Sequence, residues 1–366
     1  MKKRKNLQRN SVLKNAAVFS SVLICVICVI LKIKNLSLQE GAEILLYTAG
    51  VMPKEKSQGE LEVRKTETNE SKWWNEQFNL IEEGDIVPYH EIELPENLEK
   101  PDPNRESLPV EEIKAQGGVQ VDNFYVKDST DSGTNLAEEL LNNPAIQIKA
   151  NGEPEVLLYH THTSEAYMDN FTGFYYKDMP TRTQNQEMNV VSVGEKIKAE
   201  LEKAGIGVIH DTTVNDLSFN GSYARSWEVL QKNLEAYPTI QVTIDIHRDS
   251  MTTNEGVKYK PTVEIGGRKA AQVMILAGCD YNGGWGDFPD WRENLRLALR
   301  FQQKASGKYA DLMRPMMFSN SKYNMNATKG SLLIEVGTEV NTITEAEYSG
   351  TLIGEVLTEL LLDYRT

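Results

Sequence analysis

The stretch Val-Leu-Leu-Tyr-His-Thr-His-Thr-Ser-Glu-Ala-Tyr, residues 156–167, begins as an apolar run and ends in two histidines and a carboxylate. Its first four residues are typical of a buried β-strand and follow a turn-forming Asn-Gly-Glu-Pro at 151–154. In a strand that continues to residue 162, alternation places His160 and His162 on one face. Two of the chain's five histidines lie here, and imidazole is the commonest metal ligand. The stretch predicts a strand that carries a metal site at its end; the alternative is that these histidines only hydrogen-bond the backbone.

Strands and helices alternate from Val119 onward. In the clearest helix, 187–204, apolar residues recur with helical spacing before Gly205, and in the strand 239–247 they alternate. This order predicts an α/β domain with a mostly parallel twisted sheet that is covered by helices on both faces. The expected helices are 136–141, 187–204, 223–237, 291–313 and 345–362, and the expected strands are 155–159, 207–211, 239–247, 273–277 and 331–336.

Two further residues are candidate metal ligands because of where they stand in these elements. Glu187 heads the helix 187–204, where a carboxylate alone is an ordinary capping residue. His247 ends the apolar strand 239–247. In open α/β sheets ligands collect at the carboxyl ends of strands, so His162 and His247 are expected to converge there.

Glu335 is the one ionisable residue within the apolar run 332–336. Burying a carboxylate without a partner costs several kcal/mol or raises its pKa. Beside a zinc-bound water, such a residue serves as a general base and then returns the proton to the leaving amine. The alternative is a structural carboxylate that is bonded to Lys329 or Arg268.

The chain opens on a basic segment that is followed by an apolar run. Six lysines and arginines precede the run at 16–31, and no small-x-small cleavage signal follows before Lys32. The run is close to the roughly 20 residues that span a bilayer. Residues 1–34 therefore predict a cytoplasmic basic tail and an uncleaved transmembrane anchor, with the rest of the chain outside the cytoplasm.

Residues 35–118 are predicted to be a largely irregular extracytoplasmic spacer before a catalytic domain at 119–366. The stretch 53–72 is polar without apolar periodicity, and four prolines punctuate 95–109. The pair Trp73–Trp74 stands out within the spacer. Binding of a partner or a sugar, local packing and membrane contact all remain open for this pair.

Composition bounds the class of protein. With 366 residues, of which 40% are hydrophobic, the chain can build a sizeable core. Its formal net charge of -14 argues against nucleic acid as a partner. Three cysteines, two of them in the apolar N-terminal run, are too few for a disulfide framework or a Cys-rich zinc site.

The order of His162, Glu187, His247 and Glu335 resembles that of the zinc-dependent N-acetylmuramoyl-L-alanine amidases. Within that superfamily, three segments are closely similar to the stage II sporulation protein P family. They are Tyr-His-Thr-His-Thr-Ser-Glu-Ala-Tyr at 159–167, Asp-Ile-His-Arg-Asp at 245–249 and Ile-Glu-Val-Gly-Thr-Glu-Val-Asn-Thr at 334–342. The resemblance covers about residues 119–366, together with the layout of anchor and spacer.

The resemblance implies a zinc ion (Zn²⁺) held by His162, Glu187 and His247, with Glu335 as the catalytic carboxylate. The amidases have Gly-His-Gly where this chain has Thr-His-Thr, and alignment of the residues after the strand favours His162 over His160. A His/Glu/His set with an open fourth position is expected of a catalytic zinc site. The candidates for supporting these ligands or contacting substrate are His160, Glu165, Asp245 and Arg248.

The implied function is a membrane-anchored peptidoglycan hydrolase that cuts the amide between N-acetylmuramic acid and L-alanine, with cleavage of stem-peptide cross-links as a further expected activity. The implied setting is septal wall thinning and engulfment during sporulation, at the septal or mother-cell membrane. Other sporulation membrane proteins and a second wall hydrolase are expected partners. Two alternatives stay open. A zinc peptidase acting on an extracytoplasmic protein uses the same ligands, whereas a non-catalytic wall-binding scaffold needs neither the metal nor Glu335.

Overall fold

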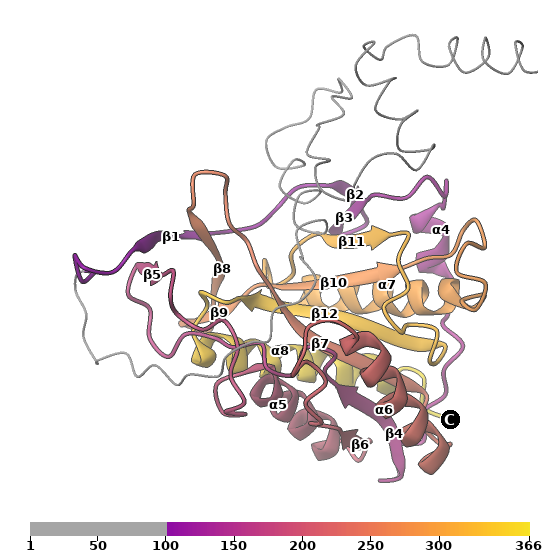
Figure 1. Cartoon of the computed structure of the whole chain (residues 1–366). Helices are drawn as coiled ribbons and strands as arrows, with labels where there is room; N and C mark the ends of the chain where they lie inside the picture. Colours follow the sequence, from indigo (N-terminus) through magenta and orange to yellow (C-terminus); the bar gives the residue numbers. More distant parts are fainter. Residues whose placement is uncertain (1–100) are drawn as a thin grey trace, which may run out of the picture. The chain divides into compact units, whose positions relative to one another are not determined.

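An eight-stranded sheet occupies the centre of the part of the chain that the computed structural model describes, residues 101–366 (Figure 1). The strand order is β2-β3-β11-β10-β12-β7-β4-β6. The pairs β2–β3 and β10–β12 are antiparallel and the other five are parallel. The bounds are β2 Val119–Val121, β3 Phe124–Asp128, β4 Pro154–Tyr159, β6 Gly207–His210, β7 Val242–Asp249, β10 Val273–Gly278, β11 Met316–Ser319 and β12 Gly330–Thr338. The predicted α/β fold with a mostly parallel sheet is confirmed.

Helices cover both faces of this sheet, as predicted. On β4, Val156 and Leu158 point into the main core with α5 (Val190–Lys203), α7 (Trp291–Lys308) and α8 (Ile343–Leu362). The alternate residues Leu157 and Tyr159 pack on the other face against Leu230 of α6 (Ser222–Ala236). The short helix α4 (Leu136–Leu141) lies beside α7.

Two glycines let α8 approach α5 closely. A Cβ atom on Gly350 would lie 2.9 Å from the carbonyl oxygen of Val193, and one on Gly354 would lie 3.0 Å from Cβ of Glu200. The two glycines are four residues apart and so share one face of the helix. Because these glycines lack a side chain, α5 and α8 can pack closely in the helix layer on this face of the sheet.

A second sheet, which the sequence pattern did not reveal, has the order β5-β1-β8-β9. Its strands are β1 Ser107–Ile113, β5 Phe174–Tyr176, β8 Lys258–Ile265 and β9 Arg268–Ala271. The last two form a hairpin through Gly266 and Gly267, whose φ angles of 58° and 76° are those of a type I′ turn. The Gly-Gly pair was the available signal for this hairpin.

Most element boundaries differ by one to three residues from the sequence expectation, and three differences have a clear local cause or bear on the site. Helix α5 begins at Val190, because the side chain of Asn189 caps it by accepting a hydrogen bond from the Val191 amide. Helix α7 ends at Lys308 rather than at residue 313, since Tyr309 turns to an extended conformation and Asp311 adopts a positive φ of 65°. Strand β4 ends at Tyr159, so the strand does not continue to His162.

The ordered fold also begins before Val119. Strand β1 lies in the predicted spacer but pairs with β5 on one side and β8 on the other. The fully buried ammonium group of Lys260 on β8 holds β1 in place. It donates hydrogen bonds to Glu112 of β1 at 2.8 Å and to Glu345 of α8 at 2.6 Å. The predicted anchor, the rest of the spacer up to residue 100 and Trp73–Trp74 lie outside the described residues. Within residues 101–366, no helix has both the length and the apolar character needed to cross a membrane.

Limited proteolysis of the full chain should leave a protected fragment that starts before Ser107. Strand β1 is bonded on both edges and four of its seven residues are half-buried, so a protease needs to open that sheet to reach it. N-terminal sequencing of the fragment checks this expectation. A fragment that starts between residues 114 and 135 would mean that β1 detaches readily from the fold.

Candidate active site

Strands β7 and β12 bring an imidazole and a carboxylate side by side. On β7, Asp245 and His247 alternate with the fully buried Ile244 and Ile246 of the main core, so both lie on the face that α6 covers. On β12, Glu335 is the register partner of His247. Parallel pairing points partners to the same face, and His247 and Glu335 therefore meet there.

His162 reaches the same face from the loop that follows β4. Its ring stacks on Phe219, with centroids 4.7 Å apart, and meets the ring of His247 edge-on at 5.4 Å. Burial lowers the pKa of His162 to about 3, so the ring is neutral. Its Nδ1 atom is buried and has no hydrogen-bond partner among the described residues. The neutral ring with an unpaired nitrogen is the form in which histidine binds a metal.

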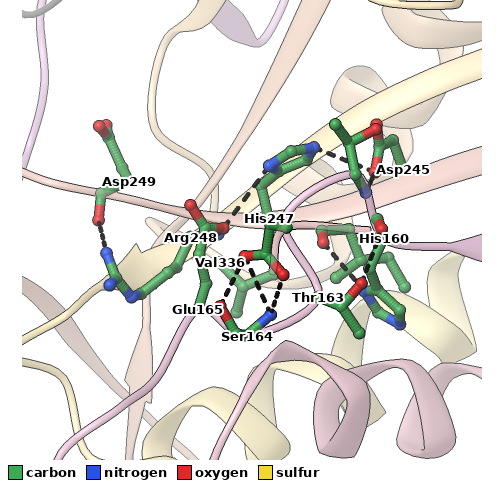
Figure 2. A network of polar contacts seen from close by, with 12 residues as sticks. His160, Thr163, Ser164, Glu165, Asp245, His247, Arg248, Asp249 and Val336 are labelled. Atoms are coloured by element: carbon green, nitrogen blue, oxygen red, sulfur yellow. Dashed lines mark hydrogen bonds and ion pairs between the residues drawn. The ribbon is translucent and has the colours of Figure 1, made fainter. Parts of the chain in front are cut away.

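His247 lies between two carboxylates (Figure 2). Its Nδ1 is 3.5 Å from Oε2 of Glu165 and its Nε2 is 3.0 Å from Oδ1 of Asp245. Burial by itself would lower the pKa of His247, but Asp245 and Glu165 outweigh it and hold that pKa well above its ordinary value. The contact to Asp245 lacks hydrogen-bond geometry, since Nε2 has no such partner among the described residues. The imidazole is thus paired by charge, and a metal that binds it displaces its proton.

Glu165 is held as an anion at this point. Its Oε2 accepts a hydrogen bond from the backbone amide of Arg248 at 3.0 Å, and Arg182 lies 3.7 Å from Oε1. Burial would raise the pKa of Glu165, but His247 and then Arg248 outweigh it and lower that pKa far below the usual range. The sequence placed Glu165 among the supporting residues, and the structure puts it directly beside both histidines.

Glu335 has the environment of a proton carrier. Burial raises its pKa to about 8, with His247 acting in the opposite direction and Asp249 in the same one. Its Oε2 atom is buried and has no hydrogen-bond partner among residues 101–366. The two structural partners considered from sequence are engaged elsewhere, Lys329 with Asp290 and Arg268 over the ring of Tyr348. Glu335 is half-buried, and a carboxylate with a buried, unpaired oxygen that is not engaged in an ion pair is consistent with a role in chemistry.

His160 does not share a face with His162, contrary to the expectation for a continuous strand. Its Nδ1 contacts the carbonyl oxygen of Ile246 at 3.0 Å, and its Nε2 contacts Nε2 of His210 at 2.8 Å. His210 in turn contacts Glu195 at 2.7 Å. The chain turns after Tyr159, which sends His160 toward α5 and β6 and His162 toward α6. With both ring nitrogens engaged, His160 supports the fold of the loop.

Asp245 and Arg248 also hold this loop in place. The carboxylate of Asp245 accepts hydrogen bonds from the amide of Thr161 at 2.8 Å and from its hydroxyl at 2.6 Å. The buried guanidinium of Arg248 donates to the carbonyl oxygens of Ala166 and Thr181 at 2.6 and 2.5 Å. Both residues therefore position His162 and Glu165 through the backbone that carries them.

Glu187 makes no hydrogen bond or ion pair with this group. It precedes the cap residue of α5, its carboxylate is exposed, and only its backbone amide is bonded, to Asn185 at 3.1 Å. Among residues 101–366, no three or more His, Cys, Asp or Glu side chains stand close enough together to hold a metal ion as they are placed. Of the three ligands predicted from sequence, the fold brings His162 and His247 together and leaves Glu187 on the surface.

The donors around His247 nevertheless fit a zinc ion in kind. Two ligands of one tetrahedral zinc, each about 2.0–2.1 Å from the ion, lie about 3.3 Å apart. Nδ1 of His247 and Oε2 of Glu165 are separated by 3.5 Å. The unpaired buried Nδ1 of His162 is the third donor. As the side chains are placed, the three donors among the described residues do not converge on one point, so the fit holds for the donor types and not for their positions.

Aromatic rings wall the site in a way that the sequence analysis missed. Phe219 stacks on His162, and Tyr223 meets His162 edge-on at 5.7 Å. The ring centroids of Tyr323 and Tyr223 lie 5.5 Å apart. Phe219 and Tyr323 come from loops without a periodic pattern, and Tyr223 stands in the first turn of α6, so no sequence signal linked them to the histidines.

A model of the family described as stage II sporulation protein P matches residues 49–358. The chain belongs to this family. The family match includes His162, Glu165, His247 and Glu335 and thus the whole group described above. The family resemblance inferred from the three sequence motifs is confirmed.

One curated relative is stage II sporulation protein P of Bacillus subtilis strain 168, which is 27% identical over 220 residues. The match covers 57% of this chain and 51% of the relative, so the chain spans about half the length of the curated relative it matches. Among solved structures, the N-acetylmuramoyl-L-alanine amidase AmiC2 of Nostoc punctiforme is similar at 11% identity and a TM-score of 0.34, over 58% of this chain and 98% of that one. The CwlD amidase of Clostridioides difficile, solved in complex with the GerS lipoprotein, is similar at 12% identity and a TM-score of 0.36, over 57% of this chain and 99% of that one. At these scores the two structures carry no information about the site.

Proposed function

We propose that the chain is a zinc-dependent peptidoglycan hydrolase that cleaves the amide between N-acetylmuramic acid and L-alanine. The observation that carries the proposal is the meeting of His162, His247 and Glu165 with Glu335 on one face of the central sheet. Membership of the stage II sporulation protein P family supports a role in sporulation.

His162, His247 and Glu165 are the residues that would hold the zinc ion. When bound, zinc polarises a water molecule and the carbonyl of the amide. Asp245 contacts the far nitrogen of His247 and so fixes the orientation of the ring, as outer carboxylates do in such sites. Phe219, Tyr223 and Tyr323 exclude bulk water from one side of the group.

Glu335 moves the proton in the proposed reaction. One O–H bond of the attacking water breaks and its proton passes to Oε2 of Glu335, while the water oxygen bonds to the amide carbon. The C–N bond then breaks and Glu335 returns the proton to the nitrogen. The products are a carboxylic acid on the muramic acid side and a free amine on L-alanine.

The proposed metal dependence is tested on the full chain with purified peptidoglycan. Release of free amino groups should stop after treatment with a chelator and return when zinc is added back, because the metal activates the water. The matched control adds magnesium, a cation that prefers octahedral oxygen ligands. Equal release with and without the chelator would exclude a zinc mechanism and leave wall binding without this chemistry as the competing function.

We further propose that residues 16–31 anchor the protein in the septal or mother-cell membrane, with the catalytic part outside the cytoplasm. The basic residues before Ala16 support this orientation. The peptidoglycan of the septum is then the substrate, and other sporulation membrane proteins and a second wall hydrolase are the proposed partners. Mass spectrometry of the mature protein should find the N-terminal segment retained. A mature N-terminus beyond Leu31 would instead indicate a released form.

A further inference from the structure

A loop with two exposed aromatic rings joins β10 to α7. Residues 280–290 read Asp-Tyr-Asn-Gly-Gly-Trp-Gly-Asp-Phe-Pro-Asp. Trp285 is 46% exposed and Tyr281 is 40% exposed. Tyrosine and tryptophan are enriched at contact sites, because each combines a large apolar ring with a polar tip.

The loop holds Trp285 in place. Oδ1 of Asp280 accepts a hydrogen bond from the Trp285 amide at 3.1 Å, and Oδ1 of Asn282 accepts one from Gly284 at 3.0 Å. Phe288, three residues further on, is buried in the main core and anchors the loop. Because these bonds fix the backbone, presenting the indole ring to a ligand costs little ordering.

A pocket of about 250 Å³ lies beside this loop, between residues 287–290 and 325–329. It is smaller than the roughly 300–1,000 Å³ that encloses a whole drug-sized ligand, so it suits a single ring or group. Asp287 accepts hydrogen bonds from Lys322 at 2.9 Å and from Asn326 at 3.1 Å. Nζ of Lys329 lies 3.7 Å from Oδ1 of Asp290.

The charges around the pocket are balanced, two carboxylates against two ammonium groups, each within reach of an opposite charge. The pocket therefore presents no net charge that would attract a charged ligand. Oδ1 of Asn326 is buried and has no hydrogen-bond partner among the described residues. The pocket therefore favours a neutral ligand that carries hydrogen-bond donors.

One short segment joins the pocket to the candidate active site. Tyr323 lies 5.5 Å from Tyr223 in the aromatic wall beside His162, and the side chain of Asn324 donates to the carbonyl oxygen of Tyr223 at 2.9 Å. Asn326 then lines the pocket. From Tyr323 to Asn326 an extended chain spans at most about 11 Å. A polymer that is bound beside His162 can thus extend to the pocket.

We propose that Trp285, Asp287 and Asn326 form a subsite for an uncharged N-acetylhexosamine ring of a glycan strand. The inference rests on the proposed peptidoglycan substrate and names which part of it is held away from the cut bond. The C–H face of a pyranose ring packs on an indole, and its hydroxyl and acetamido N–H groups donate to the carboxylate and to the unpaired amide oxygen. The subsite would let the protein prefer long strands over isolated peptides.

Binding of N-acetylglucosamine tetrasaccharide to the full chain in detergent, measured by calorimetry and saturation-transfer NMR, tests the subsite without any catalytic step. Trp285→Ala should weaken binding about tenfold or more, the loss typical of a central tryptophan in a contact, and Trp285→Phe should restore most of it. Tyr125→Ala is the matched control, because Tyr125 is also 46% exposed but lies on β3. It should bind like the unchanged chain.

Three results would overturn the subsite. They are no binding of the tetrasaccharide, equal binding by the Trp285→Ala variant, and Trp285-dependent binding of free stem peptide in place of the sugar. Thermal unfolding of each variant shows that the fold is intact. A chain that binds the sugar but releases no peptide from peptidoglycan would contradict the proposed hydrolase and keep the subsite. A chain that hydrolyses peptidoglycan but does not bind the sugar would contradict the subsite and leave the proposed hydrolase standing.

Discussion

Glu335→Gln should lower the rate of amide cleavage by about 10²-fold or more, the usual scale for loss of a general acid/base. Glutamine keeps nearly the same shape on β12 but cannot accept the proton of the attacking water. The variant should fold and bind zinc as the unchanged chain does, because Glu335 is not among the proposed ligands. Rates of free amino group release from purified peptidoglycan, together with zinc content, measure the two effects separately.

Glu264→Gln is the matched control, since Glu264 lies exposed on β8 and the same charge is removed there. It should leave the rate unchanged. If Glu335→Gln keeps a near-normal rate, Glu335 is a structural carboxylate and another residue carries the proton. If the variant loses zinc as well as activity, Glu335 is itself a ligand and the proposed set of ligands is wrong.

His247→Ala should abolish both zinc binding and turnover, the second of the two large effects. His162→Ala and Glu165→Ala should act in the same way, because two protein ligands hold zinc far more weakly than three. Glu187→Ala should change neither property, since its carboxylate is exposed and is not bonded to the histidines. Zinc content after dialysis, measured by atomic emission, is read beside the rate of hydrolysis for the four variants.

The comparison of Glu165 with Glu187 decides between two accounts of the third ligand. Loss of zinc in Glu187→Ala but not in Glu165→Ala would mean that Glu187 is the third ligand, as the family resemblance implied. That result would also require the segment before α5 to move, because Asn185 and the cap residue Asn189 now fix it on the surface.

The sequence predicted well which residues β7 and β12 carry to the site, because each strand was marked by one strong local pattern. An apolar run that reaches His247, and another that contains Glu335, identify both the strand and the polar residue on it, although both strands continue two residues beyond the expected ends. Parallel neighbours then carry such residues to the same face without further information. This reasoning needs only periodicity and topology.

The third donor and the walls of the site depend on geometry that the pattern did not contain. Whether His160 or His162 faces His247 depends on where β4 stops, and that is set by the turn after Tyr159, which the bonds of Asp245 to Thr161 hold. Glu165 joins the site because Arg248 fixes its loop through two backbone carbonyl groups. The contacts of Asp245 and Arg248 join residues far apart in the sequence, and periodicity along the chain does not predict such contacts.

The most direct test of the central claim is mass spectrometry of the products that the full chain releases from purified peptidoglycan in the presence of zinc. The account predicts free stem peptides whose L-alanine carries an unmodified amino group, and glycan strands whose muramic acid carries a free carboxyl group. If the peptides instead remain attached to muramic acid, whether uncut or separated only at their cross-links, the chain is not an amidase of this bond and the account is contradicted.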